Sequence, residues 1–536
     1  MRVVLFFLLG LLPAAACGQS VSAQPPGATP QIMADVKAGD WNDAQSLASA
    51  TGDPLMSKLV TFFQFLCPGG GTQDAIQAFM QSNPDWPEQG LLALREAQAA
   101  GLAPVSNEPE AVPFLSQAQA LHAEGNDAAA TALWLSGAKA AMQAADPAAQ
   151  LQFWPAQDQL ARALLAAGNA KDAYAVVIAV NPPTSGAKAR GQVADRDFLA
   201  GFLLLRFLHQ PTEAAGWFSD LASSSTAVIT QARAYYWLAR SESGPAATAD
   251  YARAAAYPDT YYGQLAAMAL GDDPTALAQR ILNAGEPAFT PGDALNFAVM
   301  ELPRAAALLV QMGDPQDAQI FLNRLGATAA DDRTRELAAK LAIGLGIPQS
   351  AVSIARTAGI SGQMLIREGW PMPVTPPSGA VEAAILYSIM RQESSFSPTA
   401  MSGVGAVGLM QLMPATAERT ALLNNIPYHH DLTDPVENMT LGTAYFNELQ
   451  QSFGNCLPLA IAAYNAGPTN VANWLAENGD PELGKNIGSA DLIDWIEEIP
   501  FNETRNYVQR VTESIVIYRA LLNGTAASPL QPWLQS

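Results

Sequence analysis

A short motif built around glycine recurs along the first two thirds of this 536-residue chain and determines its fold class. In each copy a polar Asn or Asp follows the glycine, and an alanine then opens an amphipathic helical pattern; the copies begin at Gly39, Gly125, Gly168 and Gly313. Glycine ends one helix in a left-handed conformation, Asn or Asp starts the next, and alanine allows close packing. Signals for β-strands are nearly absent. The motif predicts an all-α protein with short turns between helices.

The spacing of the motif suggests a repeat. The first three glycines lie 86 and 43 residues apart, which fits a helical hairpin of about that length. Stacked hairpins form an α-solenoid, here similar to irregular tetratricopeptide arrays. The alternative is an ordinary helical domain that uses common helix-end residues.

A proline-rich segment interrupts the helical pattern at residues 370–379. It contains four prolines, which lack the N–H that a helix needs and also restrict the residue before them. We therefore expect a domain boundary here. The α-helical superhelical region would cover residues 24–370, and a second, mainly helical domain would cover 371–536.

The N-terminus has the layout of a secretory signal peptide. Arg2 precedes a ten-residue apolar run, and small residues follow it. The run is too short to span a membrane. We expect residues 1–23 to be removed after Ala23. The alternative is attachment of lipid at Cys17. In either case the protein would be exported.

The charge balance limits the partners that the chain can bind. The chain contains 28 Lys and Arg residues and 49 Asp and Glu residues, which gives a net charge of −21. This argues against nucleic acids and against a basic patch for anionic lipids. An apolar content of 49% excludes intrinsic disorder. An uncharged polymer fits best.

Cysteines and histidines give no reason to expect a metal or a cofactor. Four histidines and three cysteines are present, without metal-ligand spacing. Cys67 and Cys456 could form a disulfide. The alternative, which we favour, is that both are small, buried hydrophobic residues.

The segment around Glu393 is the strongest indication of chemistry. Ile385 and Ile389 form an apolar stripe with helical spacing, widened by Leu386 and Met390, and Glu393 occupies the next position on it. A carboxylic acid on a buried face would have a raised pKa and stay protonated near neutral pH, as a general acid must. A solvated glutamate at a helix end is the alternative.

Three further motifs follow in order. Residues 402–413 hold three glycines in six residues, which would let the backbone pass close to a ligand, and then Gln411, which offers a donor and an acceptor. Residues 460–468 end an apolar helix with Tyr464 and Asn465 before a turn. Residues 495–508 hold paired glutamates and an Arg.

These four motifs together resemble those of the soluble lytic transglycosylases of Gram-negative bacteria. The helical region resembles that family more faintly, at residues 234–240 and 257–267. The resemblance implies a lysozyme-like, mainly α-helical catalytic domain after an α-superhelix, acting on peptidoglycan strands and muropeptides in the periplasm. It implies no nucleic-acid partner. Other cell-wall enzymes could bind the solenoid, and a monomer is favoured.

The resemblance also assigns roles to single residues. It places the catalytic acid and base at Glu393. It places substrate-binding residues at Ser402, Gln411, Met413, Tyr464, Asn465 and Glu497.

Chemistry alone leaves alternatives at several of these positions. Met413 could belong to the core, Tyr464 could be a packed ring, and Glu497 could lie on a solvated helix face. We expect Arg505 to pair with a carboxylate such as Glu503 or Glu498.

The resemblance implies a reaction that needs one enzymatic carboxylate. The N-acetyl group of N-acetylmuramic acid would assist bond cleavage, and the C6 hydroxyl of the same sugar would then attack C1. Glu393 would first donate and then accept a proton, leaving a 1,6-anhydro end. The alternatives are a muramidase that uses water, with Glu497 as base, and a non-catalytic scaffold that binds peptidoglycan.

Overall fold

The computed structural model of the protein describes residues 28–102, 112–479, 481 and 491–530. The expected signal peptide, including Cys17, lies outside these residues. Regular structure in the described residues is helical, apart from two isolated β-bridges in the segment 401–412. This confirms the all-α prediction.

The chain forms two compact units, each assembled from separate segments. The first comprises residues 1–106, 285–358 and 365–373, and the second comprises residues 107–284, 359–364 and 374–536. The region after the proline-rich segment is thus grouped with residues 107–284. The proline-rich segment itself is not helical, because α23 ends at Gly369 and α24 begins at Ala383.

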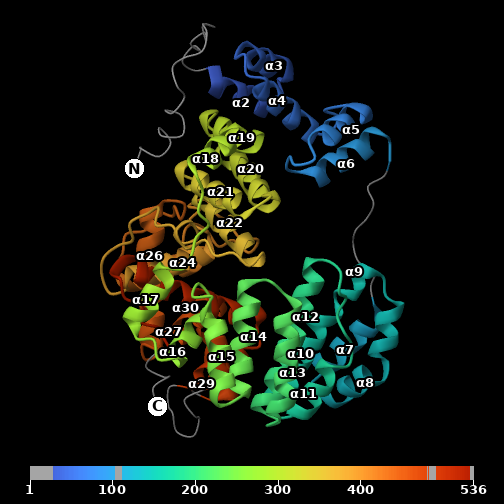
Figure 1. The fold of residues 1–536 in the computed structure, drawn as a ribbon, viewed down its shortest axis with the longest axis vertical. Coiled ribbons are helices and arrows are strands. Elements are labelled where there is room, and N and C mark those ends of the chain that lie inside the picture. Colours follow the sequence, from blue (N-terminus) through green and yellow to red (C-terminus); the bar gives the residue numbers. More distant parts are fainter. Residues whose placement is uncertain (1–27, 103–111, 480, 482–490, 531–536) are drawn as a thin grey trace. The chain divides into compact units, whose positions relative to one another are not determined.

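The first unit contains an N-terminal and a later group of helices, blue and yellow in Figure 1. Its helices are α2 (Ala28–Ala38), α3 (Trp41–Ala50), α4 (Pro54–Leu66), α5 (Gln73–Ser82), α6 (Gln89–Ala99), α18 (Pro291–Val299), α19 (Glu301–Gln311), α20 (Pro315–Thr328), α21 (Asp332–Gly344), most of α22 (Pro348–Ile360), and α23 (Ile366–Gly369). The two groups share one hydrophobic core, since the rings of Phe62 and Trp86 each lie 5.3–5.4 Å from that of Phe321.

The second unit begins with an array of helices. These are α7 (Pro113–Ala123), α8 (Asp127–Ala144), α9 (Pro147–Gln150), α10 (Phe153–Ala166), α11 (Ala170–Val177), α12 (Ala187–Arg206), α13 (Pro211–Ser224), α14 (Val228–Ser241), α15 (Gly244–Ala255), α16 (Tyr261–Ala269) and α17 (Pro274–Leu282). From α10 to α16 each helix packs on the next in sequence, as expected of a solenoid (Figure 1).

The C-terminal helices complete the second unit. They are α24 (Ala383–Glu393), α25 (Pro414–Asn424), α26 (Pro435–Ser452), α27 (Leu457–Ala466), α28 (Pro468–Asn478), α29 (Asp491–Glu498) and α30 (Asn502–Asn523). The long helix α30 lies at the centre: α24 and α27 pack against it, and so do α16 and α17 of the array. Helix α30 therefore links the array to the C-terminal helices.

The glycine motif has the predicted conformation. Gly39, Gly125, Gly168 and Gly313 have φ between +74° and +81°, and each lies between two consecutive helices. An added Cβ would meet no other atom at these glycines, so the left-handed backbone, and not crowding, explains their use.

Two further sequence expectations can be compared with the structure. No helix among the described residues is both long and apolar enough to cross a membrane. Cys456 is buried, as expected of a small hydrophobic residue, whereas Cys67 is exposed. The expectation of burial was therefore wrong for Cys67, which directly follows α4.

Candidate active site

Helix α24 places Glu393 at its last position. The stripe residues Ile385, Leu386, Ile389 and Met390 are all buried, with at most 3% of each exposed. This burial fixes α24 against α30 and aims its C-terminal residue inward. Glu393 follows this stripe at the end of the helix and is itself partly buried.

Burial gives Glu393 the protonation state of a general acid. The pKa of its carboxyl is raised to about 7, mainly by desolvation and to a smaller extent by the negative charge of the exposed Glu503. A hydrogen bond from the Tyr507 hydroxyl to Glu393 Oε1, 2.6 Å long, acts in the opposite direction. The side chain therefore exchanges a proton near neutral pH.

The loop between α24 and α25 holds an unusual backbone beside Glu393. Ser395, Phe396 and Gln411 all have positive φ, between +48° and +70°, which is rare for residues other than glycine. Such conformations persist where surrounding contacts enforce them, and they cluster at functional sites. Here the Ser394 hydroxyl donates to the Leu409 carbonyl at 2.7 Å, tying the two ends of the loop together.

Gly408 is required by a close approach within the protein. A Cβ atom at this position would lie 2.2 Å from the Leu432 carbonyl oxygen and 2.3 Å from Asn438 Nδ2. We expected this glycine to make room for a ligand. Its small size instead serves the packing of the loop on the start of α26, whereas Gly403 and Gly405 have open space around the Cβ position.

Three predicted site residues lie on the same loop. The Ser402 hydroxyl accepts a hydrogen bond from the Ala406 amide at 2.9 Å and shapes the tip of the loop. Gln411 Nε2 donates to the carbonyls of Ala400 and Gly408, both at 3.0 Å, so its donor serves the loop. Met413 is 40% exposed, which excludes the core alternative for this side chain.

Tyr464 and Asn465 lie at the end of α27. The Tyr464 hydroxyl donates to the Met410 carbonyl at 2.8 Å, and its pKa is raised by burial and, to a smaller extent, by the negative charge of Glu393. Asn465 Oδ1 accepts from the Thr504 hydroxyl at 2.7 Å, joining α27 to α30. Tyr464 thus lies near Glu393, as expected, but its hydroxyl is hydrogen-bonded to the loop that follows α24.

Sequence reasoning missed the tyrosine that contacts the acid. Tyr507 is buried on α30, one helical turn after Glu503, and makes the hydrogen bond to Glu393 described above. Tyr507 lies in the fourth motif, three residues after Thr504, so the sequence did point to this part of the chain. A helix that carries both Tyr507 and Glu503 lets one element position the carboxyl and tune its pKa.

The structure corrects the expectation for Glu497. This side chain is completely buried, and it accepts hydrogen bonds from Arg233 at 3.0 Å, from Gln509 at 2.6 Å and from the Tyr262 hydroxyl. Its backbone carbonyl accepts from Arg162 at 2.8 Å. With every partner supplied by the second unit, Glu497 joins α29 and α30 to the array and has no exposed surface for a substrate.

Arg505 is structural, as expected, but through other partners. It donates to the Ile499 carbonyl at 2.8 Å and to Asn502 Oδ1 at 3.1 Å, whereas we expected Glu503 or Glu498. Burial lowers the pKa of its guanidinium to about 10. These bonds stabilise the turn between α29 and α30.

Comparison with known proteins identifies the C-terminal region. Residues 378–487 match the family model described as the transglycosylase SLT domain. The C-terminal region is therefore similar to transglycosylase SLT domains. It includes Glu393, the loop that follows α24, and the end of α27.

Curated relatives match the same part of the chain. A soluble lytic murein transglycosylase of Salmonella typhimurium is 42% identical over 142 residues, 26% of this chain and 21% of that protein. The protein of that name from Escherichia coli K12 is 42% identical over 135 residues. A membrane-bound lytic murein transglycosylase C of Yersinia enterocolitica is 30% identical over 153 residues, 43% of its length. The matched segment spans about a fifth of the first two relatives.

The fold of the whole chain also has a counterpart. An inactive variant of the lytic transglycosylase Slt from Pseudomonas aeruginosa superposes with a TM-score of 0.60, covering 95% of this chain and 98% of that one at 21% identity. The chain therefore has the fold of that protein.

The Tyr507 hydrogen bond predicts a pH effect. In Tyr507→Phe the ionised form of Glu393 loses its donor, so the pKa should rise by about one unit, given about 1.5 kcal/mol for such a bond. The alkaline limb of kcat/KM, where the acid is lost, should move upward by the same amount. Activity at pH 6 should fall about tenfold, because the carboxyl is less firmly positioned.

Tyr464→Phe is the matched control for this experiment. Its hydroxyl lies near Glu393 but donates to Met410, so we expect a much smaller shift of the limb. The pH profile of kcat/KM for both variants is the measurement. An unshifted alkaline limb in Tyr507→Phe would show that the Tyr507 hydroxyl does not affect the pKa of Glu393.

Proposed function

We propose that this protein is a periplasmic lytic transglycosylase. It cleaves the β-1,4 bond between N-acetylmuramic acid and N-acetylglucosamine in peptidoglycan and leaves 1,6-anhydromuramic acid ends. The observation that carries the proposal is Glu393: a largely buried acid with a pKa of about 7, at the end of the first helix of an SLT domain. The curated relatives of this domain are named as murein transglycosylases.

A single carboxyl performs two proton transfers in this mechanism. Protonated Glu393 donates to the glycosidic oxygen as the C1–O bond breaks, while the N-acetyl oxygen of the muramic acid stabilises C1. The carboxylate then takes the proton of the C6 hydroxyl as that oxygen bonds to C1. The acid is thereby restored, and no water is consumed. A pKa near 7 suits both steps, since neither protonation state is strongly disfavoured.

The remaining SLT residues would bind the glycan. Met413 offers an exposed apolar surface, and Ser402, Gln411, Tyr464 and Asn465 hold the loop and the helix end beside the acid. Glycan strands and muropeptides are thus the partners that we propose. The α-superhelix would guide long strands, and no cofactor takes part in the reaction.

The hydrolytic alternative needs a second carboxylate to activate water. Glu497, the earlier candidate, is completely buried and hydrogen-bonded to three side chains. The exposed Glu503 is the carboxylate whose charge acts on Glu393, so it would have to be the base instead. The scaffold alternative gives no reason for a buried acid with a raised pKa.

Analysis of the products tests the proposal. Digestion of purified sacculi should release fragments that are lighter by one water, about 18 Da, than hydrolysis products, and no new reducing ends. Mass spectrometry of the digest decides this. Glu503→Gln should leave the product type unchanged. A majority of reducing muramic acid ends, lost in Glu503→Gln, would establish a muramidase, and absence of turnover in the wild type would establish a scaffold.

A further inference from the structure

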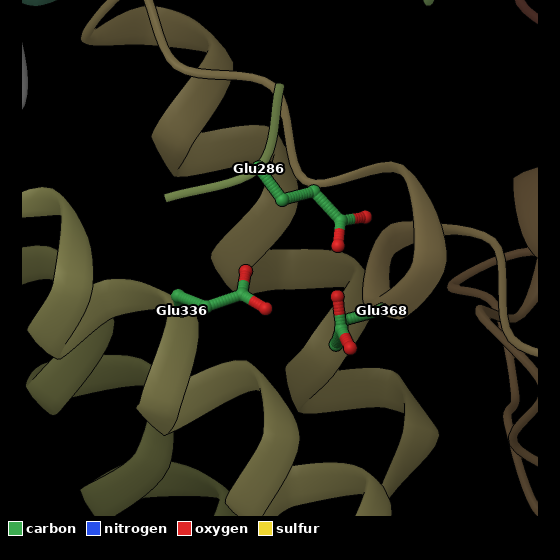
Figure 2. A group of neighbouring side chains, drawn as sticks. All are labelled: Glu286, Glu336 and Glu368. Atoms are coloured by element: carbon green, nitrogen blue, oxygen red, sulfur yellow. The ribbon is translucent and has the colours of Figure 1, made fainter. Parts of the chain in front are cut away.

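A group of three glutamates lies in the first unit, apart from the candidate active site. Glu286 comes from the segment before α18, Glu336 from α21 and Glu368 from α23, and one carboxylate oxygen of each lies within 4.8 Å of the others. Figure 2 shows the three carboxylates directed toward one another. Their mutual repulsion has to be offset, because two of the side chains, those of Glu336 and Glu368, are at most 10% exposed.

One lysine offsets part of this charge. The Lys340 ammonium lies 2.7 Å from Glu336 Oε1 and 2.6 Å from Glu368 Oε1. Glu286 Oε1 accepts a hydrogen bond from the Arg367 backbone amide at 2.9 Å, and the exposed Arg367 guanidinium lies 3.6 Å from Oε2. A single ammonium thus serves two buried carboxylates.

The other oxygen of each buried carboxylate is left without a partner. Glu336 Oε2 and Glu368 Oε2 are both inaccessible and make no hydrogen bond to any described residue. An unsatisfied buried oxygen of an ionised group costs more than a lost neutral hydrogen bond. Two buried carboxylate oxygens without a partner, in side chains that lie beside a third carboxylate, call for a cation.

We propose that Glu286, Glu336 and Glu368 bind a calcium ion. Three carboxylates without nitrogen or sulfur ligands suit a hard cation. Mg²⁺ usually takes only one or two protein carboxylates and keeps several waters, whereas Ca²⁺ takes more oxygen ligands from the protein. A set of three carboxylates therefore fits calcium better. Water would complete the coordination, and Lys340 would keep its two Oε1 partners.

The calcium site would connect the two later segments of the first unit, residues 285–358 and 365–373. Glu286 lies one residue after the start of the segment 285–358, and Glu368 lies in the short segment 365–373. Both would be fixed to the core helix α21, which bears Glu336. The glutamates are 50 and 32 residues apart in sequence, so no motif spacing indicates the site.

Calcium binding by the full-length protein tests this inference. After removal of metal with EDTA, calorimetric titration with CaCl₂ at pH 7.5 should show one site with a Kd of about 10⁻⁴–10⁻³ M, the range of extracellular calcium modules. At 10 mM CaCl₂ the Tm should rise by about 2–6 °C. The same concentration of MgCl₂ should raise it less. An equal effect of both ions would overturn the assignment to calcium.

Three variants make the test specific. Glu336→Gln and Glu286→Gln should each abolish the Tm response while remaining folded in EDTA, as circular dichroism would show; Glu286 is half-buried, which makes its variant the safer one. Glu301→Gln is the matched control, because Glu301 pairs with Lys58 at 2.6 Å in the same unit. It should keep the full response. No binding to the wild type, or an unchanged response in both site variants, would overturn the proposal.

Discussion

Replacing Glu393 with glutamine should reduce turnover of sacculi by about 10²-fold or more. The amide retains the shape of the side chain but cannot transfer a proton, and general acid catalysis contributes about 10²–10⁴-fold. In the proposed mechanism the same carboxyl acts twice, so both steps lose their catalyst. Release of anhydro-muropeptides under single-turnover conditions is the measurement, and strand binding should persist. Near-normal turnover would contradict the assignment.

The same variant should be more stable than the wild type at alkaline pH. The pKa of Glu393 in the folded protein is about 7, above the ordinary value of 4.5, so its stabilising contribution is complete below pH 4.5 and is lost as the pH rises through 7. Glutamine never ionises. At pH 8 its free energy of unfolding should exceed that of the wild type by about 1–3 kcal/mol, at about 1.4 kcal/mol per pKa unit with a reduction for partial exposure. Urea unfolding at pH 5 and pH 8 measures the difference.

The local parts of the fold could be predicted from the sequence. Helix ends marked by glycine, such as Gly125 and Gly313, depend on neighbouring residues, and the structure has them as expected. Glu393 could be placed on a buried face because helical periodicity reports the side that packs. The direction of its pKa followed from that placement alone.

Contacts between distant segments could not be predicted in this way. Glu497 carries the polar character of a ligand-binding residue, yet its partners Arg233 and Tyr262 lie more than 230 residues earlier. Nothing local reveals that α29 packs on the array. The hydrogen bond between Tyr507 and Glu393 spans 114 residues and was missed for the same reason. The clustering of Glu286, Glu336 and Glu368 depends on three separate elements.

Removing the Glu497 side chain should therefore affect stability. In Glu497→Ala the Arg233 guanidinium, whose side chain is 15% exposed, loses its buried anion, and the Tyr262 hydroxyl and Gln509 lose their acceptor. Breaking a buried ion pair from one side costs about 3–5 kcal/mol. We expect a loss of that size in the free energy of unfolding, measured by urea titration. Glu418→Ala, at an exposed glutamate of the same unit, should change it by no more than about 0.5 kcal/mol.

Glu497→Gln separates the structural role from a role in substrate binding. The amide oxygen can still accept from both Tyr262 and Gln509 in the position of Oε1, but the variant removes the charge that balances Arg233 and places an NH₂ group against that guanidinium, which is also a donor. If Glu497 acts only between the array and α29, this variant should lose stability while the KM for muropeptide chains at 10 °C stays within about twofold of the wild type. A tenfold rise in KM with unchanged stability would instead show that Glu497 binds the glycan. The buried network would then have to open during binding, because in the structure no atom of this side chain reaches the surface.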